Sequence, residues 1–436
     1  MTFQNSSASL RRLPRSKQAL PLPPHSPAAA TGGRLSDSQD NPYWRRNSRT
    51  LALGNLIVNL GWSTAFAFLP LVVRDMGVGA DLERWVGAIV FFYFAMSCVS
   101  TPVWGVLADH YGRKSMVLRA GLGMGVGFIL LSMITSPLPF LLLMMVIGLA
   151  NGYVPAGMAL IATTTPRARM GGALSLAQVG AWLGTMMGPL TGAALVGVLP
   201  QYRHLFTVTG IVMLAAGLLA LFLVREQHVR PLHPLRIDLR ADIRRLRKVP
   251  ALGVLYYMSF LFAATVFGST TVVSLFTLKM LEIQPNFRGL SVETWIAITA
   301  LGLTVASVIV LPIWGALLNR YEPVRLLRIQ LLGSFVTSLA IPLVRDPLEL
   351  TLTRLLFGLF IAGLPPTLIR MVKERAPKGM EARAFSYGTA LQNVGSGGAA
   401  LVAGLMAPYL GLRAYFWLAS GMLLVGLLMW RRLERH

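Results

Sequence analysis

The chain has 436 residues, of which 54% are hydrophobic and only 13% are charged, and its formal net charge is +23. Soluble domains carry about 25% charged residues, so this composition excludes an ordinary water-soluble protein and favours the lipid bilayer as solvent. The basic residues fall in short segments between apolar runs, which indicates a membrane-orientation signal and argues against nucleic-acid binding. With one cysteine, Cys98, no internal disulfide is possible, and the six histidines lack the spacing of a metal site.

Residues 1–48 are rich in Ser, Pro and Arg and contain no apolar run. A secretory signal needs a hydrophobic core of about 7–15 residues, and this segment has none. We expect a disordered cytoplasmic tail, with an organelle transit peptide or a misassigned start as the alternatives.

Twelve apolar stretches follow, each long enough to cross a hydrocarbon core of about 30 Å, which takes roughly 20 helical residues. The sequence therefore predicts an all-α polytopic membrane protein with twelve transmembrane helices in two pseudo-symmetric six-helix bundles. We place the first bundle at 49–224, a basic cytoplasmic linker at 225–250 and the second bundle at 251–436. The predicted spans are 50–74, 85–108, 115–135, 138–164, 170–196, 203–224, 251–278, 292–318, 326–344, 347–372, 383–408 and 411–430.

The basic residues orient these spans. Of the 40 Lys and Arg residues, one, Arg354, is assigned to the interior of a span, and most of the others fall in predicted cytoplasmic segments. By the positive-inside rule, both termini are predicted to be cytoplasmic, in a bacterial inner membrane. Seven basic residues fall in the predicted outer loops: Arg74, Arg84, Arg203, Lys279, Arg288, Arg345 and Arg413.

The linker contains the segment LRIDLRADIRRLRKV, in which four apolar residues, Leu235, Leu239, Ile243 and Leu246, share one helical face. A helix lying on the anionic inner leaflet fits this pattern. A solvated linker helix packed against protein fits it nearly as well.

The two halves resemble each other at an offset of 210 residues. TPVWGVLADHY (101–111) matches LPIWGALLNRY (311–321), and the fourth and tenth spans align as well. Parallel six-helix repeats predict a binding site near the bilayer midplane, between the halves. The matched pairs are Pro102/Pro312, Trp104/Trp314, Gly105/Gly315, Tyr111/Tyr321, Gly148/Gly358 and Pro155/Pro365.

The segment GVLADHYGRK (105–114) resembles the loop between the second and third helices of the major facilitator superfamily. This resemblance implies a latch that holds the two halves together on the cytoplasmic side; the simpler alternative is a tight basic turn. The second half has Asn319 in place of the aspartate, so any second latch is expected to be weaker. The matching residues are Gly105, Asp109, Gly112, Arg113 and Lys114.

In the fifth span, GAWLGTMMGPLTGA (180–193) resembles the antiporter motif of the same superfamily. Glycines four residues apart form one smooth helix stripe, and a proline bends the helix. The resemblance implies export rather than uptake. The matching residues are Gly180, Gly184, Gly188, Pro189 and Gly192.

The fourth span departs from the superfamily pattern, because Met144 stands where a buried arginine is expected. The equivalent position in the tenth span is Arg354, four residues before Gly358. A charge within a span costs roughly 2.5–3.5 kcal/mol on insertion scales, which favours a functional role in the cavity or in coupling. The alternative is an arginine that reaches the outer interface.

Acidic residues are absent from the middle of every predicted span. If protons drive transport, their carrier lies nearer an interface, and Asp109 and Asp75 are the leading candidates. No Walker motif is present, so ATP is not expected to drive transport.

In this architecture the first, fourth, seventh and tenth helices line the cavity, with contributions from the fifth and eleventh. An apolar and aromatic cavity with few polar groups suits an amphipathic ligand. The candidate cavity residues are Asn55, Asn59, Asn151, Tyr153, Gln178, Tyr256, Tyr257, Arg354, Gln392 and Asn393.

The whole resemblance covers residues 48–432 and is greatest to the twelve-helix drug/proton antiporters, which include tetracycline and multidrug efflux proteins. It implies a monomer that exchanges a small molecule for protons, with no cofactor and no metal. A dedicated exporter of an endogenous metabolite such as a siderophore is the alternative, and Arg354 favours a ligand with anionic or metal-chelating oxygens. A lipid flippase is a third possibility. No nucleophile–base constellation indicates an enzyme.

Overall fold

A computed structural model describes residues 42–226, 244–246, 249–377 and 381–434. The side chains of some helical residues, Asp109 and Asn319 among them, also lie outside the description. The first half contains α1 (Trp44–Arg74), η2 (Gly79–Asp81), α2 (Leu82–Tyr111), α3 (Arg113–Leu131), α4 (Pro137–Ala150), α5 (Tyr153–Thr164), α6 (Arg167–Val196) and α7 (His204–Leu223). The second contains α9 (Pro250–Ile283), η3 (Phe287–Gly289), α10 (Val292–Arg320), α11 (Pro323–Ser338), η4 (Ile341–Leu343), α12 (Pro347–Ile361), α13 (Leu364–Arg375), α14 (Glu381–Leu410) and α15 (Leu412–Glu434).

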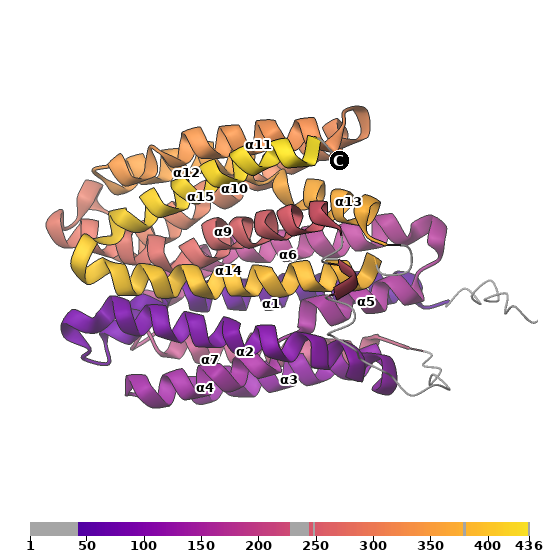
Figure 1. Ribbon diagram of the computed structural model, residues 1–436. Helices are drawn as coiled ribbons and strands as arrows, with labels where there is room; N and C mark the ends of the chain where they lie inside the picture. The colour runs from indigo at the N-terminus through magenta and orange to yellow at the C-terminus, as the bar shows by residue number, and fades with distance from the viewer. Residues whose placement is uncertain (1–41, 227–243, 247–248, 378–380, 435–436) are drawn as a thin grey trace, which may run out of the picture. The chain divides into compact units, whose positions relative to one another are not determined.

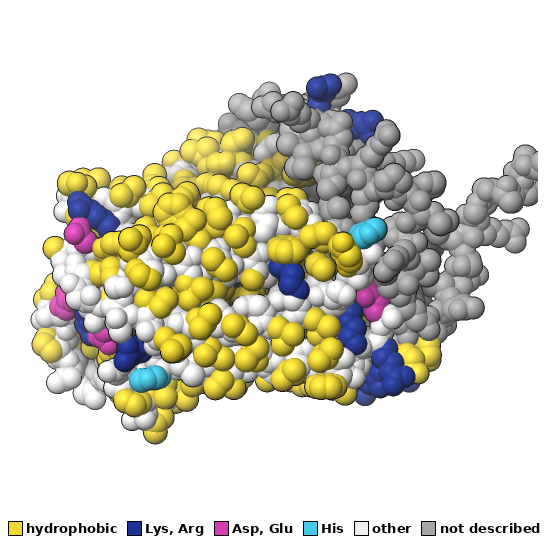
Figure 2. Space-filling model, turned by 90° about the horizontal axis from the view of Figure 1, so that it is seen from below, with side chains coloured by type: hydrophobic (Ala, Val, Ile, Leu, Met, Phe, Trp, Pro, Cys, Tyr) yellow, Lys and Arg dark blue, Asp and Glu magenta, His cyan; other side chains and the backbone are white. Residues whose placement is uncertain are grey.

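These helices form the spans of a multi-pass membrane protein. Within the described residues, 11 helical stretches are long and apolar enough to cross a bilayer. The helix α14, with 30 residues, supplies the remaining span of the predicted twelve. Figure 2 shows apolar side chains spread over the middle of one face, while charged side chains gather mainly toward its two ends. This is the surface that a protein presents to lipid, and the predicted fold class is confirmed.

The helices run side by side, and α14 lies between α9 and α2 (Figure 1). The main packing between the two halves joins α2 with α14 and α6 with α10. Within the first half, α1 packs most extensively on α6. We call the end of the bundle with the α1–α2 connection the outer end and the opposite one the inner end, following the orientation predicted from the charges.

Local chemistry sets where many helices begin. Pro137 and Pro347 stand in the first turn of α4 and α12, where a missing N–H costs nothing. The Asp346 carboxylate accepts the backbone N–H groups of Leu348 and Glu349, both at 2.9 Å. The turn between α2 and α3 passes through Gly112 at φ 91°, a conformation that favours glycine.

Equivalent hydrogen bonds recur in the two halves at the offset of 210 residues. The indole Nε1 of Trp104 donates to the Leu149 carbonyl at 2.6 Å, and that of Trp314 donates to the Leu359 carbonyl at 2.8 Å. Both tryptophans thereby tie a helix of the repeated motif to the middle of the fourth or tenth span. The internal repeat seen in the sequence is thus a repeat of atomic contacts.

The fourth and tenth spans are each broken near the middle. Residues 138–164, predicted as one continuous helix, form α4 and α5 with a break at Asn151 and Gly152. Gly152 has φ 136°, which an L side chain rarely adopts, and its N–H donates to the Asn151 side chain at 2.7 Å. The tenth span breaks between α12 and α13 at the equivalent place, around Gly363. Broken helices in a membrane need such internal partners for their freed backbone groups.

The helix α1 begins at Trp44, so residues 44–48, assigned above to the tail, are helical. Residues 1–41 lie outside the description, as does most of the linker 225–250, with Leu235, Leu239 and Ile243 of its apolar face; the fourth residue, Leu246, is described and buried. The domain boundaries at 224 and 251 therefore stay a prediction.

Candidate functional site

The antiporter glycines form the contact surface of α6 against α1. A methyl group built on any of them would overlap atoms of α1: Ala52 at Gly180, Leu56 at Gly184, Leu60 at Gly188 and Phe68 at Gly192. Glycine at these positions lets the two helix backbones approach closely. The glycine stripe predicted from the sequence therefore forms the surface along which α6 crosses α1.

Pro189 in the same motif leaves a backbone carbonyl of α6 without its helical donor, and a side chain of α1 supplies a donor instead. A proline has no N–H, so the carbonyl four residues earlier, that of Thr185, loses its helical donor. The Ser63 hydroxyl of α1 donates to this carbonyl at 2.8 Å. One turn further on, Thr64 donates to the Gly188 carbonyl at 2.7 Å. The Gly-Pro pair thus bonds α6 to α1 as well as packing against it.

This crossing forms one wall of a pocket between the two halves. Ser63, Thr185 and Pro189 lie on that wall, beside the indoles of Trp62 and Trp182. The opposite wall, from α9, α10 and α12, is made of Val266, Thr270, Ala300, Leu303, Thr304 and Arg354. The space open to the centres of water molecules is ≈ 30 Å³, enough for about two water-sized groups in this conformation.

Arg354 is the charged group of this pocket. It lies about two turns from the start of α12, and only 4% of it is exposed. Its Nε has no hydrogen-bond partner. The side chain is therefore buried beside the pocket, which differs from the alternative of an arginine that reaches outer water.

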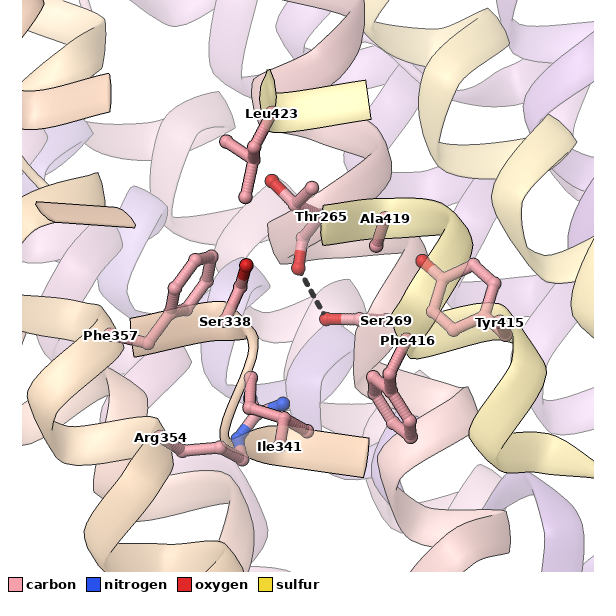
Figure 3. A pocket seen from close by; sticks show the side chains of 10 residues that line it. All are labelled: Thr265, Ser269, Ser338, Ile341, Arg354, Phe357, Tyr415, Phe416, Ala419 and Leu423. Carbon is pink, nitrogen blue, oxygen red and sulfur yellow. Dashed lines mark hydrogen bonds between the residues drawn. The ribbon is translucent and has the colours of Figure 1, made fainter. Parts of the chain in front are cut away.

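A second pocket, inside the C-terminal half, shares Arg354. Figure 3 shows the guanidinium in the same space as the hydroxyl-bearing residues Thr265, Ser269 and Ser338, with the rings of Phe357, Tyr415 and Phe416 around them. This pocket leaves ≈ 20 Å³ to the centres of water molecules. Arg354 thus stands between a space within one half and a space between the halves.

The other candidate cavity residues are bound elsewhere or lie outside these two pockets. Asn55 donates to the Ala177 carbonyl at 3.2 Å and Asn59 to the Asn55 carbonyl at 2.7 Å. Asn151 donates to Ser97 at 2.9 Å. The hydroxyls of Tyr153 and Tyr257 donate to the carbonyls of Ala216 and Met422 at 3.3 and 3.1 Å. Gln178 is exposed, and Tyr256, Gln392 and Asn393 are half-buried.

The loop between α2 and α3 is tied to its own half. The Arg113 guanidinium donates to the Ala159 carbonyl of α5 at 2.7 Å, and the Lys114 ammonium donates to the Leu221 carbonyl of α7 at 2.8 Å. Gly105 has open space beside it, and the Asp109 side chain lies outside the description. The role of this loop as a latch therefore stays a prediction.

The N-terminus of α3 holds a carboxylate that the sequence analysis did not single out. The backbone N–H groups of Arg113 and Lys114 donate to the two oxygens of Glu226, at 3.0 and 2.8 Å. A carboxylate is stabilised there because the first N–H groups of a helix lack internal partners and the helix dipole is positive. No local pattern indicates this contact, since Glu226 follows the motif by more than 100 residues.

Arg119 corrects the expectation that Arg354 is the only charge within a span. It lies inside α3, with its guanidinium 3.5 Å from the Trp104 ring centre and its Nη2 donating to the Asn151 carbonyl at 3.3 Å. A cation over an indole face is attracted by the ring quadrupole. Its place within the predicted span 115–135 is the signal that could have identified it.

The contacts between the halves described here lie toward the outer end. Lys279 of α9 forms an ion pair with Glu83 of α2, which is only 6% exposed. Arg84 donates to the Tyr409 hydroxyl at 3.1 Å. Nearby, Gly87 of α2 and Gly404 of α14 allow the two backbones to touch, because a methyl group on either would overlap the other helix.

A tyrosine–carboxylate hydrogen bond adds to this outer contact. The Tyr202 hydroxyl, between α6 and α7, donates to Glu293 of α10 at 2.6 Å. Burial and this bond together raise the pKa of Tyr202 to about 12, so the hydroxyl keeps its proton at physiological pH. Asp75 lies at the end of α1, where partial burial raises its pKa although Arg74 opposes the shift.

A family model for the Major Facilitator Superfamily matches residues 51–347 and 286–436, which is nearly the whole helical bundle. The chain belongs to the Major Facilitator Superfamily. It is thus a secondary transporter and a multi-pass membrane protein that acts on small molecules, in a superfamily of transporters rather than enzymes.

Relatives within this superfamily cover almost the full length of the chain. The multidrug resistance protein MdtG of Citrobacter koseri is 30% identical over 407 residues, which are 92% of this chain and 98% of that protein. MdtG of Salmonella paratyphi C is 29% identical over 407 residues, or 92% of this chain and 99% of that protein.

Solved structures of the superfamily share the fold at low sequence identity. A variant of the nucleoside transporter NupG has a TM-score of 0.74 at 13% identity, over 88% of this chain and 99% of that one. An inward-facing bacterial homologue of the human lysosomal transporter Spinster has a TM-score of 0.71 at 13% identity, over 89% and 96%. The chain thus shares the three-dimensional arrangement of its helices with these solved transporters.

Proposed function

We propose that this transporter exports a small amphipathic molecule from the cytoplasm in exchange for protons, by rocking of the two halves about the pocket between them. The observation that carries the proposal is the position of the Gly188–Pro189 pair. It lies on α6 where that helix is bonded to α1, and Pro189 lines the pocket between the halves. In the superfamily, this motif is typical of antiporters that export.

The full-length similarity to multidrug resistance proteins supports efflux as the direction of transport. The pocket supports an amphipathic ligand, since two indoles and several aliphatic side chains line it beside one charge. An apolar surface with one or two polar groups binds the apolar part of a ligand by burial and orients the polar part by hydrogen bonds.

The distribution of contacts supports a rocking mechanism with this conformation open toward the inner end. Glu83 with Lys279, and Tyr202 with Glu293, join the halves at the outer end. At the inner ends of α2 and α10, a methyl group built on Gly105 or on its repeat equivalent Gly315 would meet no atom of the described residues within 4 Å. A ligand would then enter from the cytoplasm, and breaking the outer contacts would open the way out.

The proposal is tested with inside-out membrane vesicles that contain the full chain, supplied with an amphipathic dye and energised by respiration. We expect the dye to accumulate inside these vesicles and not in vesicles without the protein. Collapse of the proton gradient with a protonophore is expected to abolish accumulation. Uptake that continues without the gradient would refute proton coupling, and a complete lack of uptake of drug-like dyes would refute multidrug export.

The rocking step is tested at the ion pair between the halves. In a Cys98→Ser background, spin labels at the outer ends of α2 and α9 report their separation. We expect Lys279→Gln to shift the distance distribution toward larger values, because Glu83 loses its partner across the interface. Exchange of the charges, Glu83→Lys with Lys279→Glu, is expected to restore closure.

The matched control is the exposed ion pair between Arg325 and Glu322, which lies within one half. Arg325→Gln is expected to leave the outer distances unchanged. An equal shift in both variants would show that the effect does not come from contact between the halves.

A further inference from the structure

Arg354 carries a buried charge that the described part of the chain does not neutralise. The residue is 4% exposed, its Nε has no hydrogen-bond partner, and neither pocket that it lines contains an acidic side chain among the described residues. An isolated charge in a low-dielectric environment is costly unless it is paired and hydrogen-bonded. The guanidinium therefore has capacity for an anionic partner.

The hydroxyl groups of the pocket inside the C-terminal half do not compete for that role. Thr265 and Ser269 donate to the helix carbonyls of Leu261 and Thr265 at 2.9 and 2.6 Å. Tyr415 donates to the Ala264 carbonyl at 2.8 Å. Ser338 donates to the Phe335 carbonyl at 2.7 Å. Since each hydroxyl hydrogen is already used within the protein, the free donors in this pocket, drawn in Figure 3, belong to the guanidinium.

The pocket between the halves follows the same pattern. Ser63 and Thr185 donate to the carbonyls of Thr185 and Ala181 at 2.8 and 3.0 Å. Thr270 and Thr304 also donate to carbonyls of their own helices. A ligand group that satisfies these pockets must accept hydrogen bonds and carry negative charge. Carboxylates and phosphate-like groups meet both conditions, and the planar fork of an arginine fits them in bidentate fashion.

The geometry thus points to a substrate class. Resting on the export proposed above, we propose that the exported molecule carries an oxyanion, that Arg354 binds this group, and that the apolar body of the molecule lies against Trp62 and Trp182. Because Arg354 lines both pockets, the anion would be held at the point where the second half faces the first.

Purified full-length protein tests this assignment with a matched pair of dyes, a rhodamine with a free carboxylate and its methyl ester. Binding is followed by quenching of tryptophan fluorescence. We expect the wild-type protein to bind the carboxylate roughly tenfold more tightly than the ester, the usual value of a charge-assisted hydrogen bond. In Arg354→Gln the preference is expected to disappear, and in Arg354→Lys, which keeps the charge without the fork, part of it is expected to remain.

Arg328→Gln is the matched control, because Arg328 lies outside both pockets and is exposed. It is expected to keep the wild-type preference. A preference for the carboxylate that survives in Arg354→Gln, or equal binding of the two dyes by the wild type, would overturn the assignment. Displacement of the dye by inorganic phosphate at comparable concentration would also overturn it, because the site would then hold a free anion rather than a group of the substrate.

Failure of export is distinguishable from failure of the anion site. If the wild-type protein prefers the carboxylate in solution, and the preference depends on Arg354, but vesicles accumulate neither dye, the anion site stands and the export proposal fails. If vesicles accumulate both dyes equally in the wild type and in Arg354→Gln, export stands and the anion site is wrong.

Discussion

Each half of the bundle has an arginine within a predicted span: Arg119 in the first half is half-buried, and Arg354 in the second is buried. Arg119 lies near the inner end, against the ring of Trp104 and the Asn151 carbonyl, although its Nε and Nη1 have no hydrogen-bond partner. Arg354 of the second half lies toward the outer end, beside two pockets, and its Nε has no partner. The difference between them is that Arg119 contacts an indole and the broken fourth span, whereas Arg354 lies beside two pockets.

The same contrast holds for glycine. Gly188 of α6 is pressed against α1, while a methyl group on Gly398, its equivalent in α14 at the offset of 210, would meet no atom of the described residues within 4 Å. The repeat preserves the tryptophan-to-carbonyl bonds, and it keeps a tight crossing at another position, because a methyl group on Gly395 of α14 would overlap the Phe260 backbone of α9. The two halves thus share a common framework of hydrogen bonds but differ in how tightly their helices pack at equivalent positions.

The largest expected effect comes from this pair of glycines. Gly188→Val forces a branched side chain into the backbone of α1, and we expect a loss of about 3 kcal/mol of unfolding free energy, the upper end of overpacking costs. Gly398→Val is expected to cost much less. Thermal unfolding of the purified variants in one detergent gives the comparison, and equal losses would contradict the difference in packing between the two positions.

Opposite signs are expected for substitutions of Arg354 and Arg119. Arg354→Leu removes a charge without a counter-ion, so we expect the unfolding free energy without ligand to rise by about 1–4 kcal/mol. Arg119→Leu removes the contact with the indole and a hydrogen bond to a carbonyl, and a loss of about 1–2 kcal/mol is expected. Denaturation of both variants beside the wild type measures this, and a change of the same sign would contradict the division of roles.

The tryptophan pair should show the smallest difference. Trp104→Phe and Trp314→Phe each remove one hydrogen bond to a helix carbonyl, worth about 1 kcal/mol. Trp104→Phe is expected to cost more, because phenylalanine is a weaker platform for Arg119 than the indole is. If the excess loss persists when Arg119 is replaced as well, it does not arise from the cation over the ring.

Much of the fold was open to prediction from local patterns. Apolar length indicated the spans, the 210-residue offset indicated the repeat, and the four-residue glycine spacing indicated the crossing of α6 on another helix. The break at Asn151 was not predicted, because the apolar run continues through it. Asn151 was placed among the cavity residues for its polarity, yet its side chain bonds to Gly152 and Ser97 beside that break.

Partners that are distant in sequence account for the rest. Nothing near Arg113 indicates that Glu226 will meet the start of α3, and nothing near Glu83 indicates that Lys279 will face it. Both contacts arise only when helices from separate parts of the chain pack together. Arg354 was identified from its cost within an apolar span, but its missing counter-ion is a property of the surrounding helices.

The sequence by itself determined a membrane transporter of two repeated halves. Hydropathy and charge placement decide which segments enter the bilayer and in which orientation, and both can be seen in a single segment, as can the spacing of the motifs. Only the tertiary structure decided which buried groups are satisfied and which are left over. That difference depends on the distances and free hydrogen-bonding atoms that remain once the helices have packed. It is the reason why Arg119 meets an indole and a carbonyl, whereas Arg354 lies beside two pockets.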